Sequence, residues 1–251
     1  MVTQTTASVP LTDKTPKKIA GMFDQIAGRY DLLNTVLSGG MDRYWRARAV
    51  RSLRLTGRER ALDVCTGTAD VALALARRGR AASVVGIDFS GEMLRLGRDK
   101  VKRAAGAAAS GTERAPIGLT RGDAMRLPLP SNSVDTVTVA FGIRNVQDPP
   151  IACREMARVM TTGGRLAILE FSMPQTPVIS HVYRWYFRHV LPRIGRLVSH
   201  HEEAYTYLPE SVGVWATPET FANVLRDSGF SDVRATPMTF GTVYLYTATK
   251  R

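Results

Sequence analysis

Residues 60–70 have the sequence RALDVCTGTAD, in which a short apolar strand runs into a loop of small residues and then into a helix. Gly67 permits close approach of the backbone to a ligand, and the small side chains of Cys65 and Ala69 leave room at the helix N-terminus. The same residues also fit an ordinary strand–helix turn. The loop therefore indicates a strand–loop–helix unit, and a binding site only if other features agree.

Strands and helices continue to alternate after this unit. We expect strands at 60–64, 83–87, 117–121, 134–141 and 165–171, with helices at 70–78, 90–102 and 149–160 between them. This alternation predicts an α/β fold with a doubly wound, mostly parallel, Rossmann-like sheet. The C-terminal part departs from it, because a helix at 219–228 precedes two strands at 233–237 and 243–249. These strands predict an antiparallel closing pair.

The composition is that of a folded protein with an excess of positive charge. The 251 residues include 34 Lys and Arg against 22 Asp and Glu, a net charge of +12, and 44% are hydrophobic. Two cysteines are too few for a disulfide framework, which favours a reducing, cytoplasmic setting. No secretory signal opens the sequence, and no run approaches the ~20 apolar residues of a membrane span. The charge alone fits nucleic acid, an anionic membrane surface or acidic small molecules.

The chain divides into three parts by pattern. Residues 1–15 are polar and predict a disordered tail. Residues 16–56 predict helices, because Ile19, Phe23, Ile26 and Tyr30 recur at spacings of three and four. We expect 16–56 to form a lid over a domain at 57–251, which carries a helical insertion at about 176–212.

Acidic residues follow the first three predicted strands. Asp63 ends the first strand, Asp88 follows the second, and Asp123 follows the third within Gly122-Asp123-Ala124. In such sheets ligands bind at the carboxyl ends of the strands, where Asp88 can accept hydrogen bonds from both ribose hydroxyls of an adenosine. Several carboxylates suit a cationic adenosyl ligand better than the pyrophosphate of NAD, and the G-x-G-x-x-G spacing is absent. We therefore predict S-adenosylmethionine as the cofactor, and no metal.

Motifs along most of the chain resemble the ubiquinone/menaquinone biosynthesis C-methyltransferase family. The resemblance runs from Lys17 to Tyr246 and includes outer motifs that general methyltransferases lack. The matching motifs are Tyr30-Asp31-Leu32-Leu33-Asn34 with Ser38 and Trp45, residues 122–124, residues 141–146 (FGIRNV), residues 158–160 with 163–172 (RVM and GGRLAILEFS), residues 207–211 (YLPES) and Phe240-Gly241.

The resemblance implies a class I methyltransferase fold and a set of cofactor contacts. These would include Thr68, Asp88, Asp123, Ala124 and the end of the fourth strand. With Asp63 and Gly67 from the first strand and its loop, they form the predicted cofactor site. Two positions depart from the family pattern. Ala140 stands where many relatives carry Ser, so a contact there would use the backbone, and Asp42 replaces a frequent His, so we assign it no role.

The resemblance also implies methyl transfer to a ring carbon of a polyprenylated quinol, which reacts as its phenolate. Arg144 and Asn145 are candidates to hold that phenolate by charge and hydrogen bond, although Arg144 equally fits a structural pair with an acidic residue. Tyr30, Asp31 and Asn34 are candidate lid residues, with Tyr30 alternatively in the core. His201 is a candidate general base or, alternatively, a surface residue.

Residues 179–198 predict an amphipathic helix with apolar and basic residues. It could lie on a membrane surface, which would place the protein at the inner face of the membrane, or simply pack on the domain.

Several functional alternatives stay open from the sequence. Overall similarity favours demethylmenaquinol as substrate, with a 2-methoxy-6-polyprenyl-1,4-benzoquinol of the ubiquinone pathway as the alternative. An RNA or other small-molecule methyltransferase is less favoured, because the Arg residues are dispersed without aromatic stacking motifs, and we expect no nucleic acid partner. A non-catalytic adenosyl-binding subunit would have no need of Arg144 and Asn145. The oligomeric state is open, a homo-oligomer included.

Overall fold

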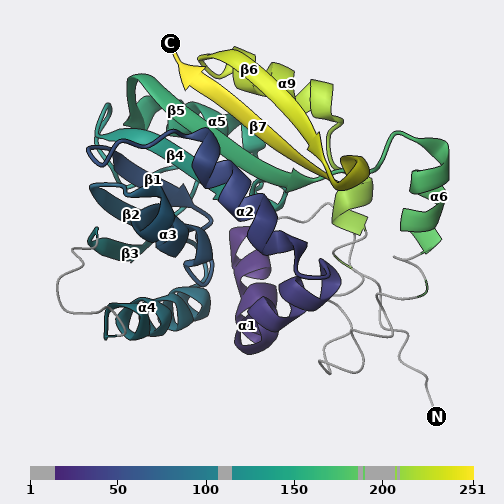
Figure 1. The fold of residues 1–251 in the computed structure, drawn as a ribbon, viewed down its shortest axis with the longest axis horizontal. Coiled ribbons are helices and arrows are strands. Elements are labelled where there is room, and N and C mark those ends of the chain that lie inside the picture. The colour runs from purple at the N-terminus through teal and green to yellow at the C-terminus, as the bar shows by residue number, and fades with distance from the viewer. Residues whose placement is uncertain (1–14, 107–114, 186–188, 190–206, 208–209) are drawn as a thin grey trace.

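A seven-stranded sheet forms the centre of the molecule. The computed structural model describes residues 15–106, 115–185, 189, 207 and 210–251. The strand order is β3-β2-β1-β4-β5-β7-β6, and β7 runs antiparallel to both of its neighbours while the other pairs are parallel (Figure 1). This confirms the predicted α/β sheet with its antiparallel closing strand. The strands are β1 Arg60–Val64, β2 Ser83–Asp88, β3 Ile117–Arg121, β4 Val134–Ala140, β5 Met160–Phe171, β6 Phe230–Met238 and β7 Val243–Lys250.

Helices cover both faces of the sheet because the central strands are apolar on both sides. In β5, Leu166 and Ile168 belong to one buried cluster and Ala167 and Leu169 to the other, as the two-residue period of a strand requires. The first cluster includes α5 (Pro149–Val159) and α9 (Pro218–Asp227), and the second includes α2 (Met41–Ser52) and α3 (Asp70–Ala74). The carboxyl ends of β1, β2, β3 and β4 consequently meet at one edge.

Two N-terminal helices pack beside this edge. Helix α1 (Pro16–Leu37) begins with proline at its first position, where the missing N–H has no helical partner to lose. The turn to α2 uses Gly39 and Gly40, whose φ angles of +57° and +79° suit glycine. Within the described part of the chain, α1 adds no residue to either buried cluster, and it contacts chiefly α4 (Gly91–Gly106).

Some element boundaries differ from the expectation. The predicted helix 70–78 is α3 followed by one wider turn, η1 (Leu75–Gly79), which brings Gly79 against α2. A Cβ on Gly79 would lie 2.8 Å from Leu55 Cδ1, the end of a side chain, so this turn packs closely against Leu55. Helix α4 extends to Gly106, beyond its predicted end. The predicted helix 179–198 begins as α6 (Pro177–Trp185), and most of its remainder lies outside the described residues, as do residues 1–14.

Candidate active site

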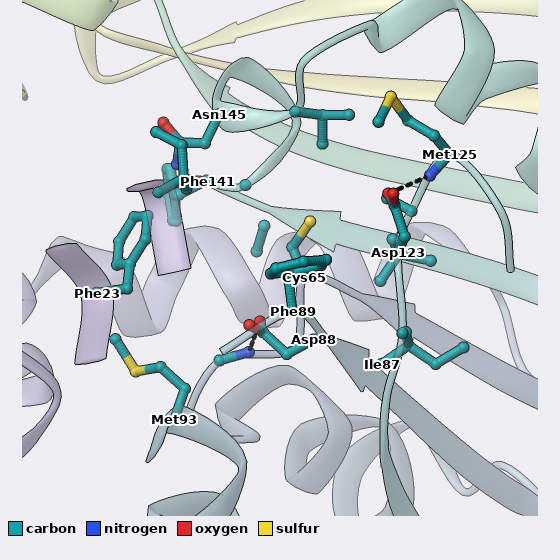
Figure 2. Close-up of a pocket in the computed structure, with 18 of the residues that line it drawn as sticks. Phe23, Cys65, Ile87, Asp88, Phe89, Met93, Asp123, Met125, Phe141 and Asn145 are labelled. Carbon is teal, nitrogen blue, oxygen red and sulfur yellow. Dashed lines mark hydrogen bonds between the residues drawn. The ribbon is translucent and has the colours of Figure 1, made fainter. Parts of the chain in front are cut away.

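A hollow opens to solvent at the carboxyl edge of the sheet. The wall combines the loops after β1, β2, β3 and β4 with the inner side of α1, which contributes Ile19, Phe23 and Tyr30. Figure 2 shows Phe23 on one side of this pocket and Asp123 on the other. The predicted strand-end location of the site thus coincides with the pocket.

The loop after β1 is shaped by unusual backbone angles. Cys65, Gly67 and Ala69 have φ angles of +55°, +54° and +68°, and a Cβ on Gly67 would meet nothing within 4 Å. The Gly67 N–H donates to Asp88 Oδ2 at 2.8 Å (Figure 2). The carboxylate after β2 therefore helps to fix the glycine loop, in addition to facing the pocket.

Asp88 has the acceptor capacity that a ribose requires. Its Oδ1 accepts from the Ser90 N–H at 2.9 Å, and each carboxylate oxygen keeps a second lone pair. Burial raises the pKa of Asp88, although hydrogen bonds from Ser90 and Gly67 lower it. The carboxylate lines the pocket and is held in place by backbone donors. It fits a ribose diol.

Asp123 and Ala124 form a second polar position. Asp123 Oδ1 accepts from the Met125 N–H at 2.8 Å, and its other oxygen has no hydrogen-bond partner within the described ranges. Ile87 and Met125 supply apolar surface beside it, and Ala124 is nearly buried. A flat base with an amino group matches one free acceptor between apolar walls, so the residues present fit an adenosyl group.

Asp63 and Thr68 are placed behind the pocket wall, and neither lines the hollow. Asp63 is buried, and its carboxylate accepts from Thr66 Oγ1 at 2.6 Å and Thr138 Oγ1 at 2.7 Å. Burial raises the pKa of Asp63 to about 6. The Thr68 hydroxyl donates to Asp31 Oδ1 at 2.6 Å, so in this structure it contacts the N-terminal helix.

The predicted lid residues lie on α1 in different surroundings. Tyr30 lines the pocket, hydrogen bonds to the side chain of Asn34, and has its pKa raised by burial. Asp31 instead faces α4, where Asp31 Oδ2 lies 2.7 Å from Lys100 Nζ. One helix thus both covers the pocket and is fastened to the domain beneath it.

Arg144 and Asn145 differ in what they contact. Both are buried in η2 (Ile143–Asn145) directly after β4, but only Asn145 lines the hollow. Arg144 is 5% exposed and its Nη1 lies 2.7 Å from Glu170 Oε1 and 2.6 Å from the Phe141 carbonyl oxygen. Asn145 Oδ1 accepts from the Tyr207 hydroxyl at 2.9 Å. The side chain that reaches the pocket is therefore the amide.

Sequence reasoning did not assign roles to Glu170, Tyr207 or Phe23, which the structure brings to the site. Glu170 lies within the motif 163–172 and Tyr207 within the motif 207–211, and these motifs were the feature of the sequence that could have pointed to both residues. Phe23 was identified only as part of an apolar helix face. Ala140 lines the pocket, and His201 lies outside the described residues.

Comparison with solved structures gives the class of protein. A SAM-dependent methyltransferase from Thermotoga maritima matches with a TM-score of 0.64 at 16% identity, over 93% of this chain and all of that one. A methyltransferase from Methanococcus maripaludis matches with a TM-score of 0.57 at 18% identity, over 98% of this chain and 97% of that one. The fold is that of S-adenosylmethionine-dependent methyltransferases.

Sequence comparison gives the family. The model of the ubiE/COQ5 methyltransferase family matches residues 11–250, and this chain belongs to that family. A demethylmenaquinone methyltransferase of Deinococcus radiodurans is 45% identical over 96% of this chain and 97% of its own length. A ubiquinone/menaquinone biosynthesis C-methyltransferase of Syntrophotalea carbinolica is 46% identical over 90% of this chain and 91% of its own.

Proposed function

We propose that this chain transfers a methyl group from S-adenosylmethionine to a ring carbon of polyprenylated demethylmenaquinol, giving menaquinol. The observation that carries the proposal is the pair Asp88 and Asp123, two acceptors from the ends of neighbouring strands facing one hollow. The substrate is inferred from relatives named for demethylmenaquinone methylation at 40–45% identity.

Asp88 would hold the ribose and Asp123 the adenine amino group, with Ala124 and the backbone of Ala140 beside them. Gly67 leaves open space for the rest of the cofactor. When bound, the cofactor supplies an electrophilic methyl carbon on a sulfonium. Asp63 and Thr68 support this site from behind, through Thr66, Thr138 and α1.

The quinol becomes a carbon nucleophile when its hydroxyl loses a proton, because the phenolate oxygen pushes electrons onto the neighbouring ring carbon. That carbon would bond to the methyl group as the methyl–sulfur bond breaks, with the electron pair of that bond leaving on sulfur as a neutral thioether. The ring carbon would then release its own proton, which restores the aromatic ring. The chain must therefore favour the phenolate, align the ring and exclude water. Tyr30 and Phe23 line the pocket from α1, where they would help to exclude water from the ring.

Asn145 is suited to the phenolate because its amide is oriented. The Tyr207 hydroxyl donates to Asn145 Oδ1, and burial raises the pKa of Tyr207, which keeps that hydroxyl protonated. The Asn145 amide nitrogen donates to the Phe141 carbonyl oxygen at 3.5 Å, and its second N–H is the one that would meet the phenolate. Arg144 adds positive charge behind Asn145, and it shares that charge with Glu170.

Asn145→Ala should lower kcat while leaving the affinity for the cofactor nearly unchanged. Arg144→Ala should also slow methyl transfer, but it would in addition leave Glu170 buried without its cation.

The proposal includes an N-terminal lid at 16–56 and contact with a membrane surface through 179–198, where the tail of the substrate would be reached. Among the described residues no helix has the length and apolarity to cross a bilayer. His201, as a general base in the segment outside the described residues, stays a prediction.

The deciding experiment incubates the protein with methyl-labelled S-adenosylmethionine and either demethylmenaquinol or the ubiquinone-pathway benzoquinol. We expect the label in a menaquinol one methyl group heavier than its substrate, identified by mass spectrometry. Label only in the benzoquinol would favour the second function, which the name of the Syntrophotalea relative supports. Label in neither quinol would overturn both.

A further inference from the structure

We propose that Glu170 is a positioning residue for methyl transfer: through Arg144 it holds residues 141–146 in the conformation in which Asn145 faces the pocket. The inference rests on the proposed function in one respect, since it takes Asn145 as the group that meets the substrate. We refer to residues 141–146 as the β4 turn.

Glu170 is a fully buried carboxylate near the end of β5, a strand adjacent to β4 in the sheet. Its Oε1 accepts from Arg144 Nη1 at 2.7 Å and from the Phe171 N–H at 2.8 Å. Its Oε2 accepts from the Arg144 backbone N–H at 3.2 Å. A buried charge is tolerated only with such compensation. Two of its three donors belong to Arg144, so the carboxylate holds both the backbone and the guanidinium of that residue.

Arg144 in turn contacts the β4 turn and the residues around it. Its Nη1 donates to the Phe141 carbonyl at 2.6 Å, its Nε donates to Ser211 Oγ at 3.3 Å, and its guanidinium lies 5.4 Å from the centre of the Phe171 ring. Phe141 has a φ angle of +61°, a left-handed conformation that costs an aromatic residue energy and needs support from its surroundings. The hydrogen bond to its carbonyl gives that support.

The β4 turn has little room to move toward the pocket. A Cβ added to Gly142 would lie 2.3 Å from Cys65 Cβ, so the backbone of the turn lies directly against the glycine loop that precedes α3. Phe141, Gly142 and Asn145 all line the pocket. A shift of this turn would therefore move Asn145 and change the packing around Cys65 together.

Glu170→Gln tests the charge with little change in shape. The glutamine oxygen can still accept from Arg144 Nη1 and the Phe171 N–H, but its NH2 then opposes the Arg144 backbone N–H, so two donors meet. We expect kcat with demethylmenaquinol to fall about 100-fold, as for a reacting group displaced by about 1 Å, while the Kd for S-adenosylmethionine changes by less than about 3-fold. Glu170→Asp keeps the charge and should restore part of kcat.

Glu59→Gln is the matched control. Glu59 is also buried, accepts backbone N–H groups of Thr56, Gly57 and Arg58, and pairs with Arg165, but it lies outside the pocket lining. Loss of the Glu59 charge should lower the melting temperature and leave kcat per folded molecule unchanged. If Glu170→Gln and Glu59→Gln lower stability alike and both keep full kcat, Glu170 is structural and the proposal is wrong.

A second measurement needs no quinol. Cys65 lines the pocket, whereas Cys153 is fully buried, so a maleimide reagent should label Cys65 first in the folded protein. If Glu170 holds the β4 turn, Glu170→Gln or, should that variant not fold, Glu170→Asp should raise the rate of Cys65 labelling about 10-fold, because Gly142 packs against the Cys65 side chain and displacement of the turn would expose the thiol further. An unchanged labelling rate overturns the positioning role. Failure of the wild type to methylate either quinol, with this labelling difference present, overturns only the proposed function.

Discussion

At the scale of the residue, Asp88 has two tasks that separate experiments can distinguish. It fixes the glycine loop through Gly67 and presents its carboxylate to the pocket. Asp88→Asn replaces one acceptor oxygen by a donor that must oppose the N–H of Gly67 or Ser90. We expect the Kd for S-adenosylmethionine to rise about 10- to 100-fold, the loss of one or two charged hydrogen bonds, measured by titration calorimetry.

Asp135→Asn is the control for this change, because Asp135 binds Arg60 at the start of β1, outside the pocket lining. The Kd of the Asp135→Asn variant for S-adenosylmethionine should equal that of the wild type. An Asp88 variant with wild-type affinity would mean that the ribose is held elsewhere.

Asp63 should give the stability a distinctive pH dependence. Its pKa is raised by burial from 3.8 to about 6, so the folded protein binds a proton more readily than the unfolded chain. The free energy of unfolding should therefore fall as the pH rises from about 4 to about 6, by up to about 3 kcal/mol, and level off above. Asp63→Asn should remove this contribution, as urea unfolding at a series of pH values would measure.

The pKa of Asp135 is lowered to about 2 by Arg60, so its own titration falls below this window. Asp135→Asn should therefore keep the slope between pH 4 and 6. An equal slope in wild type and Asp63→Asn would contradict the raised pKa.

At the scale of the element, α1 makes several polar contacts with the domain. Asp31 accepts from Thr68 Oγ1 and pairs with Lys100, and Asp24 accepts from the Ser90 hydroxyl and the Glu92 N–H. Ala20 and Ala27 of α1 are buried, but among the described side chains none of this helix belongs to the two large clusters, so we expect α1 to open more readily than the sheet; it also lines the pocket. We infer that opening of α1 limits exchange of the cofactor.

Asp31→Asn should accelerate dissociation of S-adenosylmethionine about 5-fold, as expected for loss of a partly exposed ion pair. Stopped-flow displacement measures this rate. Asp99→Asn removes an exposed partner of Arg95 on the same α4 and should leave the rate unchanged. Equal rates in both variants would show that the α1 contact with Lys100 does not control exchange.

At the scale of the whole molecule, the pocket joins loops from four strands of one continuous sheet. A ligand there stabilises the entire folded domain. At a cofactor concentration of 100 times Kd, the gain is about 2.7 kcal/mol, or a rise of roughly 5–10 °C in Tm for a chain of this size. Calorimetry should show this shift for the wild type and a smaller one for Asp88→Asn at the same concentration. A wild-type Tm that does not respond would contradict binding to the folded domain.

Much of the site was predictable because its residues are fixed by local pattern. Asp88 and Asp123 follow strands whose apolar runs are evident, and parallel strands bring their ends together. The direction of the Thr68 side chain was not predictable, since its hydroxyl binds Asp31, 37 residues away. The close packing of Gly79 against Leu55 was likewise not predictable, because the two residues meet only in the folded structure.

The sequence by itself determined the α/β alternation, the parallel sheet and the carboxylates at its edge, because periodicity and turn chemistry act over a few neighbouring residues. Only the tertiary structure decided which buried charges meet. Arg144 pairs with Glu170 across 26 residues, and Thr138 binds Asp63 across 75. Such partners are selected by the cost of burying an unpaired charge or polar group, and that cost exists only once the sheet has formed.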